Sequence, residues 1–183
     1  MKHKTLIRML LAALFAALTA VGAFLKIPVG TISFTLQVFF TCMAGVLLGP
    51  YWGALSQLVY VALGLAGLPI FTMGGGLTYF AVPTFGFLLG LIPMVFVVGL
   101  LSRKGLSRLP WLWLRLAVAC VAGLVVLYAV GLPYLYFTLG GAWSVSKTLV
   151  SGCLIFLPFD ALKIVCVVLL GVRLLPVLRR FEA

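Results

Sequence analysis

Residues 27 to 102 read IPVGTISFTLQVFFTCMAGVLLGPYWGALSQLVYVALGLAGLPIFTMGGGLTYFAVPTFGFLLGLIPMVFVVGLLS and include no charged residue. A transmembrane helix needs roughly 20 apolar residues, so this stretch has room for more than three of them. The whole chain of 183 residues is 65% hydrophobic and only 8% charged, which is too few charges to cover a water-facing surface. We therefore expect one all-α membrane domain over residues 1–183.

Glycine, proline and charged residues divide the apolar sequence into six predicted spans. They lie near residues 5–25, 34–49, 52–68, 84–101, 112–132 and 150–173. If the N-terminus is cytoplasmic, six spans leave only Lys26 and Lys147 facing outward. The other flanking basic residues then lie at the cytoplasmic face, as the positive-inside rule requires: Lys2, Lys4, Arg8, Arg103, Lys104, Arg108, Arg115, Arg173, Arg179 and Arg180. We expect a multi-pass plasma-membrane protein with both termini cytoplasmic.

The first span also has features of a cleaved signal peptide, because basic residues precede it and Ala20 and Ala23 are small. Cleavage would leave five spans and would put the basic loop at residues 103–108 and the basic C-terminal tail on opposite sides. We therefore expect this helix to be retained.

Several functional classes are disfavoured by the residue types present. The net charge of +11 comes from basic residues at the ends of apolar runs, which is unlike a nucleic-acid-binding surface. No two cysteines form a CxxC pair, so we expect no metal site. The spans hold one carboxylate, one lysine and no histidine, so we expect no catalytic residues and no enzyme. Without a nucleotide-hydrolysing motif, active transport would draw energy from another subunit or an ion gradient.

The sixth span carries two charges, in the run FLPFDALK at residues 156–163. Asp160 and Lys163 are three residues apart and share one helix face. Each charge near the bilayer centre costs roughly 2.5 to 3.5 kcal/mol, so both should point towards a partner or a watery cavity. A structural ion pair is the alternative, but buried pairs add little net stability. We predict that both residues bind substrate.

Two further segments have unusual compositions. Residues 67–84 are apolar but rich in Gly and Pro, including Gly75 in a run of three glycines. Irregular backbone at membrane depth occurs only inside protein or along a cavity, so we expect a lid or pocket wall over the outer mouth, with a close backbone approach to a ligand. In the first span, Ala12, Ala16 and Ala20 form one small-residue face, and Ala13 and Ala17 form a second. We expect the face with Ala12, Ala16 and Ala20 to meet a partner helix.

Four stretches together resemble the BioY family, the biotin-specific substrate-binding (S) components of energy-coupling-factor (ECF) transporters. They are IPVGTISFTLQ at 27–37, AGVLLGP at 44–50, GLPIF at 67–71 with the glycines 74–76 and PTFGFLLG at 83–90, and FLPFDALK at 156–163. The last stretch is the most specific. Departures occur at Phe85–Phe87, where the family usually has a glycine pair and a tyrosine, and at Phe159, which replaces a common glycine.

The resemblance implies a six-helix substrate-binding subunit that works with a transmembrane coupling protein and two ATPases, or in some members without dedicated partners. It also implies biotin as cargo and no cofactor. The ureido N–H groups would donate to Asp160, and Lys163 would donate to a ligand oxygen. Phe34, Tyr79 and Phe85 are candidates to cover the apolar bicycle and tail. Two alternatives remain: a membrane assembly protein in which Asp160 and Lys163 only fix helix packing, and a proton-coupled carrier in which Asp160 titrates.

Overall fold

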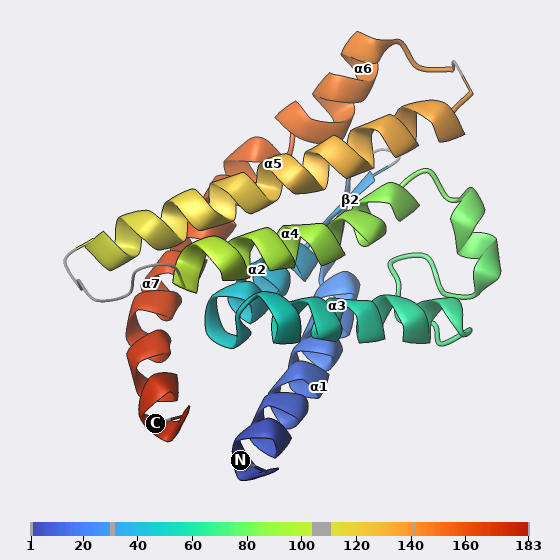
Figure 1. Cartoon of the computed structure of the whole chain (residues 1–183). Coiled ribbons are helices and arrows are strands. Elements are labelled where there is room, and N and C mark those ends of the chain that lie inside the picture. Colours follow the sequence, from blue (N-terminus) through green and yellow to red (C-terminus); the bar gives the residue numbers. More distant parts are fainter. Residues whose placement is uncertain (1, 30–31, 104–110, 141, 183) are drawn as a thin grey trace.

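The computed structural model describes residues 2–29, 32–103, 111–140 and 142–182. Lys104 and Arg108 lie outside these residues. Lys2, Arg179 and Arg180 belong to described helices, but their side chains lie outside the description. The chain is mostly helical (Figure 1). Its elements are α1 (Lys2–Phe24), β1 (Lys26–Val29), β2 (Ile32–Thr35), α2 (Gln37–Leu48), α3 (Pro50–Leu65), the 3₁₀ helix η1 (Leu77–Ala81), α4 (Phe85–Arg103), α5 (Leu112–Thr138), α6 (Val145–Leu149), the π-helical turn η3 (Val150–Leu154) and α7 (Leu157–Glu182).

Helix α2 lies at the centre of the bundle. It contacts α1, α3, α4, α5 and α7, and most of its 12 residues are buried. Gly45 permits this close packing, because a Cβ there would lie 2.9 Å from the carbonyl oxygen of Val95 in α4. Gly86 of α4 meets the side chain of Tyr134 in α5 in the same way, and α4 and α5 run side by side (Figure 1). Both glycines therefore serve packing between helices of the bundle.

Six long helices occur among the described residues, matching the predicted number, but their lengths differ. Helices α1, α4 and α5 and the segment Val145–Leu178 are long and apolar enough to cross a membrane. Helices α2 and α3 have 12 and 16 residues, which is short of a full span. The span predicted at 34–49 starts late because its first residues belong to β2, and the one predicted at 150–173 starts in the π-helical turn and continues to Glu182.

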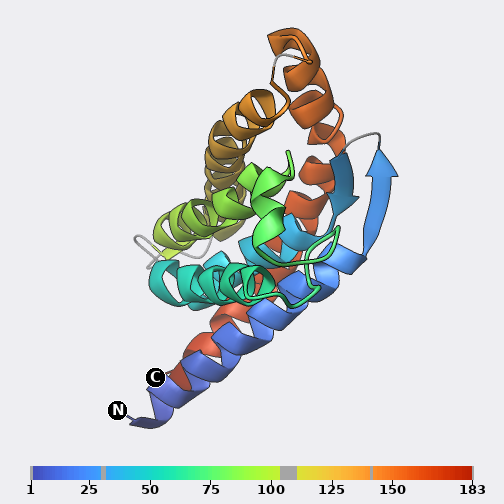
Figure 2. The ribbon, with the colours of Figure 1, turned by 90° about the vertical axis from the view of Figure 1, so that its right-hand side faces the viewer.

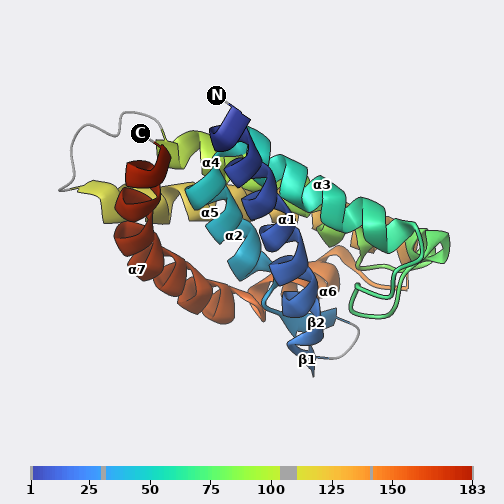
Figure 3. The same cartoon turned by 90° about the horizontal axis from the view of Figure 1, so that it is seen from below.

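An antiparallel β-hairpin, which the six-span interpretation did not include, joins α1 to α2. Strands β1 and β2 pair from Lys26↔Thr35 to Val29↔Ile32. The base of the hairpin is fixed, because the backbone N–H of Leu36 donates to the carbonyl oxygen of Gly22 at the end of α1. Figure 3 shows the hairpin at one end of the molecule, beyond the end of α1.

The segment between α3 and α4 is irregular, as its Gly and Pro content predicted. It contains an isolated bridge between Phe71 and Gly74, followed by η1. Gly74 and Gly76 have φ angles of +112° and +95°, which side chains rarely allow. The backbone can therefore turn sharply at these two glycines and return towards α4.

A buried hydrogen-bond network joins the first three helices. The Gln57 side-chain amide of α3 donates to the Thr19 hydroxyl of α1 at 3.1 Å, and the Thr41 hydroxyl of α2 donates to the Gln57 carbonyl at 3.1 Å. All three residues are fully buried. Interhelical hydrogen bonds in lipid contribute roughly 0.6 to 2 kcal/mol each, so the network holds α1 against α2 and α3.

Candidate ligand-binding site

A cavity lies where the hairpin, the segment 67–84 and helices α2, α4, α5 and α7 converge. Its wall combines apolar side chains from α4 and α5 with hydroxyl, amide and charged groups from the other elements. A mostly apolar wall with a few polar groups is typical of small-molecule sites. Figure 2 shows how the elements that form this wall are arranged, with β2 and α7 on one side and α4 and α5 on the other.

The charged part of the wall comes from the first two turns of α7. The Lys163 ammonium donates to Asp160 Oδ1 at 2.9 Å, and only 3% of Asp160 and 7% of Lys163 are exposed. Asp160 lies in the first turn of the helix, where the unpaired backbone N–H groups favour a negative charge. Because both residues also line the cavity, the pair faces the cavity and is not enclosed by helices on every side.

Tyr128 of α5 supplies a second hydrogen bond to the same carboxylate. Its hydroxyl donates to Asp160 Oδ2 at 2.5 Å. Each carboxylate oxygen of Asp160 thus has one donor within the protein and retains lone pairs for a ligand. Because the donors come from α5 and α7, the carboxylate is held in a fixed orientation.

Phe34 of β2 covers the Lys163 ammonium. The ammonium lies 4.0 Å from the centroid of the Phe34 ring, and the same ring packs on Phe159 of α7 with centroids 4.5 Å apart. Side chains alternate along a strand, so Ser33 and Thr35 point to the other face and line the cavity. From one face of the hairpin, Phe34 contacts Lys163. From the other face, Ser33 and Thr35 line the cavity.

The segment 67–84 contributes hydroxyl groups. The Thr72 hydroxyl and the Tyr79 hydroxyl are hydrogen-bonded at 2.8 Å, and both residues line the cavity together with Thr84. The Lys26 ammonium of β1 donates to the backbone carbonyl oxygen of Thr72. This bond links the hairpin to the segment 67–84 at the cavity wall.

The six predicted substrate-binding residues occupy different positions. Asp160, Lys163 and Tyr79 line the cavity. Phe34 reaches Lys163 but lines a neighbouring apolar crevice, and Phe85 is fully buried with its ring centroid 6.2 Å from that of Tyr79. Gly75 packs outside the cavity, where a Cβ would lie 2.1 Å from the Leu68 carbonyl oxygen and 2.9 Å from that of Gly64 at the end of α3. Its backbone serves the turn of the segment, so a direct ligand contact at Gly75 stays a prediction.

The two alanine faces of α1 have different environments. Ala12 and Ala16 are 3% and 5% exposed and belong to the core, and Ala20 is partly buried. Ala13 and Ala17 are exposed. The contact with a partner helix that we predicted for Ala12, Ala16 and Ala20 stays a prediction, but the face that α1 leaves open is the one with Ala13 and Ala17.

Sequence reasoning missed Gln37, Thr72 and Tyr128 as cavity residues. Gln37 had a usable signal, because it is a polar residue in an apolar segment and ends the stretch that resembles the BioY family. Tyr128 had none, because a single tyrosine in an apolar span is also typical of ordinary packing. Among the described residues, no group of His, Cys, Asp and Glu side chains is placed to hold a metal ion.

Comparison with known proteins decides the family. The BioY family model matches residues 1–180. The chain belongs to the BioY family. A "Probable biotin transporter BioY" of Lysinibacillus sphaericus is 46% identical over 139 residues, covering 76% of this chain and 69% of that protein. The "Biotin transporter BioY" of Thermotoga maritima is 39% identical over 164 residues, covering 89% of this chain and 92% of that protein.

The fold also matches a solved member of this class. The crystal structure of the S-component for biotin from an ECF-type ABC transporter superposes with a TM-score of 0.86 at 27% identity, covering 95% of this chain and 93% of that one. The match confirms the predicted all-α membrane fold of the S-component type. BioY membership confirms the resemblance drawn from the four sequence stretches, and it agrees with a transport role, not an enzymatic one.

Proposed function

We propose that this chain is the biotin-binding membrane subunit of an ECF-type vitamin uptake transporter. The observation that carries the proposal is the buried Asp160–Lys163 pair on the wall of a cavity. Charges at this depth are expensive unless they serve a partner or a ligand. The names of the BioY relatives and of the matching S-component structure support biotin as the ligand.

The geometry of the pair suits the ureido group of biotin. A ureido edge places an N–H donor beside a carbonyl acceptor. Asp160 accepts and Lys163 donates, and their polar atoms lie 2.9 Å apart, so the pair offers the complementary acceptor and donor side by side. An analogue without the N–H donors would leave the carboxylate without its ligand partner, which is a strong basis for selectivity.

The partners proposed for the chain are a transmembrane coupling subunit and two ATPase subunits. The sequence has no nucleotide-hydrolysing motif, so uptake driven by ATP would draw its energy from other chains. The ECF-type context of the matching structure supports this arrangement. The exposed Ala13–Ala17 face of α1 is the surface of this helix that allows the closest approach of a partner helix.

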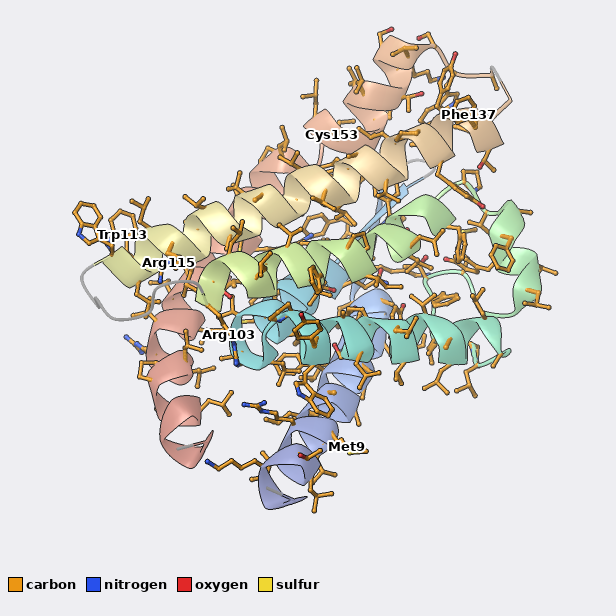
Figure 4. All side chains as sticks on the ribbon, viewed as in Figure 1. Met9, Arg103, Trp113, Arg115, Phe137 and Cys153 are labelled. Carbon is orange, nitrogen blue, oxygen red and sulfur yellow. The ribbon has the colours of Figure 1, made fainter. Side chains whose placement is uncertain are left out.

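We place both termini on the cytoplasmic side. The start of α1 and the end of α7 lie on the same side of the molecule (Figures 1 and 2). In Figure 4, Arg103, Trp113 and Arg115 cluster where the end of α4 faces the start of α5, and Phe137 lies at the opposite end of α5. Basic residues gather at the cytoplasmic face of membrane proteins and tryptophans at the interfaces, so the end with Arg103 and Arg115 is the cytoplasmic one.

The two alternative functions explain less of the site. A purely structural ion pair has no need of a cavity, yet Asp160 and Lys163 both line one. A proton-coupled carrier would need a carboxylate that exchanges protons as the substrate moves, whereas Asp160 already accepts from Lys163 and Tyr128. Donors held at both oxygens fix the orientation of the carboxylate and suit a stationary acceptor for ligand N–H groups.

Uptake in cells tests the proposed function. The gene would be expressed with the coupling and ATPase subunits in a bacterial host that lacks its own biotin transporter, and accumulation of radiolabelled biotin would be measured. We expect uptake by the wild-type protein and a strong loss with Asp160→Asn. Ser102→Ala is the matched control, since Ser102 is buried but donates to Gly99 away from the cavity. Equal uptake by cells with and without the wild-type chain would contradict the proposal.

A further inference from the structure

Gln37 stands where three elements meet at the cavity. It is the first residue of α2, it lines the cavity, and only 7% of it is exposed. Its side-chain Oε1 accepts from the Thr35 hydroxyl of β2 at 3.0 Å, and its Nε2 donates to the Tyr60 hydroxyl of α3 at 2.9 Å. Tyr60 in turn donates to the backbone carbonyl oxygen of Ile70 at 3.1 Å, in the segment 67–84.

The donor and the acceptor in each of these hydrogen bonds can be assigned by starting from the Ile70 carbonyl group. A backbone carbonyl can only accept, so the Tyr60 hydroxyl proton must go to Ile70. The Tyr60 oxygen is then left to accept, and it faces the NH₂ end of the Gln37 amide. The Gln37 carbonyl end therefore faces Thr35, whose hydroxyl must donate. Burial makes the reverse arrangement costly, because it would set acceptor against acceptor.

The hydrogen bonds described above use only one of the two N–H donors on Nε2 of Gln37. An amide NH₂ group carries two N–H donors, and among the described residues Nε2 of Gln37 has Tyr60 as its one hydrogen-bond partner. The second N–H belongs to a nearly buried side chain on the cavity wall. Such a donor is costly to leave unmatched when a ligand excludes water from the cavity.

We propose that Gln37 is a ligand-contacting residue whose second amide N–H donates to an acceptor oxygen of the bound ligand, and that Tyr60 is the positioning residue that fixes this orientation through Ile70. The inference rests on the proposed binding of biotin, which offers such oxygens in its ureido carbonyl and its carboxylate. Selectivity for the ligand then depends on a group outside the Asp160–Lys163 pair.

Biotin titration of purified full-length variants tests the inference. Gln37→Met keeps the length of the side chain but removes the donor, so we expect biotin affinity to fall roughly 5-fold to 100-fold. Tyr60→Phe should weaken binding less, because the Gln37 amide remains but is free to rotate. Since Tyr60 acts through Gln37, the double variant should bind no more weakly than Gln37→Met alone.

Thr41→Val is the matched control. Thr41 lies one turn further along α2, is fully buried, and donates to Gln57 instead of lining the cavity. Its melting temperature should fall while its biotin affinity stays within about twofold of wild type. A Gln37→Met affinity no lower than that of Thr41→Val would overturn the ligand contact. Additive losses in the double variant would overturn the positioning role of Tyr60.

The acceptor atom is identified by repeating the Gln37→Met comparison with biotinol, in which a hydroxymethyl group replaces the carboxylate. A smaller loss than with biotin assigns the carboxylate as the acceptor, and an equal loss assigns the ureido oxygen. Failure of wild-type protein to bind biotin would overturn the proposed function itself. Binding by wild type with unchanged affinity in Gln37→Met would overturn only the inference about Gln37.

Discussion

The buried carboxylate of Asp160 holds the polar part of the cavity together. It accepts from Lys163 within its own helix and from Tyr128 across the bundle, and Phe34 covers the ammonium from the hairpin. Removing one member of such a group leaves the others buried without a partner. Single substitutions here therefore separate a binding role from a structural one.

Replacing Asp160 with Asn tests the role of the carboxylate. The amide keeps the shape, but its NH₂ group would face the N–H donors of the ligand. Loss of a charge-assisted hydrogen bond removes roughly 1.5 to 3 kcal/mol, so biotin affinity should fall by about one to two decades. We expect the protein to stay folded. The melting temperature and the biotin dissociation constant of one preparation measure both effects.

If the pair were purely structural, Asp160→Asn would lower the stability of the protein strongly and leave its biotin affinity unchanged. Lys163 would be left as a buried unpaired charge, which costs roughly 3 to 5 kcal/mol of stability. A large drop in melting temperature, together with unchanged affinity in the folded fraction, would therefore argue against Asp160 as a ligand-binding residue.

Individual site residues differed in how far sequence could predict them. The position of Asp160 and Lys163 at a cavity could be predicted, because charges in an apolar span have few uses. Tyr128 was not, because it is 32 residues away from its partner Asp160 and nothing in the spacing connects them. Phe85 was predicted to touch ligand but is fully buried behind Tyr79, since sequence alone does not order aromatic rings by depth.

At the scale of elements, the hairpin and the segment 67–84 form the part of the cavity wall that helices do not provide. Lys26 joins them through the Thr72 carbonyl oxygen, and Tyr60 ties the same segment to α3. The Gly and Pro content of 67–84 predicted irregular backbone correctly. The hairpin was missed because residues 26–33 fall between two predicted spans, and strand pairing depends on contacts that sequence does not specify.

Helix α1 provides a test of the proposed assembly, because its two alanine faces lie in different environments. Ala13→Phe adds bulk to the open face and should prevent close approach of the coupling subunit, while biotin binding is retained. Ala12→Phe adds bulk to the core and should instead lower the melting temperature, since overpacking typically costs 1 to 3 kcal/mol or more. Co-purification with the coupling subunit and thermal unfolding are the readouts.

Val125→Phe is the control for α1, because Val125 is 64% exposed on α5, away from the alanine faces. Complex recovery with this variant should match wild type. Unchanged recovery of the complex with Ala13→Phe would mean that this face of α1 contacts lipid and not the coupling subunit.

At the scale of the whole molecule, the described helices, the hairpin and the segment 67–84 enclose a mostly apolar cavity that carries a charged pair. The fold class, the number of long helices and the charged pair all followed from sequence, because hydrophobicity and charge place them directly. The shortness of α2 and α3 did not, because their lengths depend on the hairpin before them and on the irregular segment after them.

Titration of the purified wild-type chain with biotin tests the central claim most directly. Isothermal titration calorimetry of the protein in nanodiscs would report both affinity and stoichiometry, without any partner subunit. We predict tight, saturable binding at one site per chain, because one cavity carries the Asp160–Lys163 pair. Absence of biotin binding by folded protein, with saturable binding of a different vitamin, would contradict biotin as the ligand and leave only the class of transporter standing.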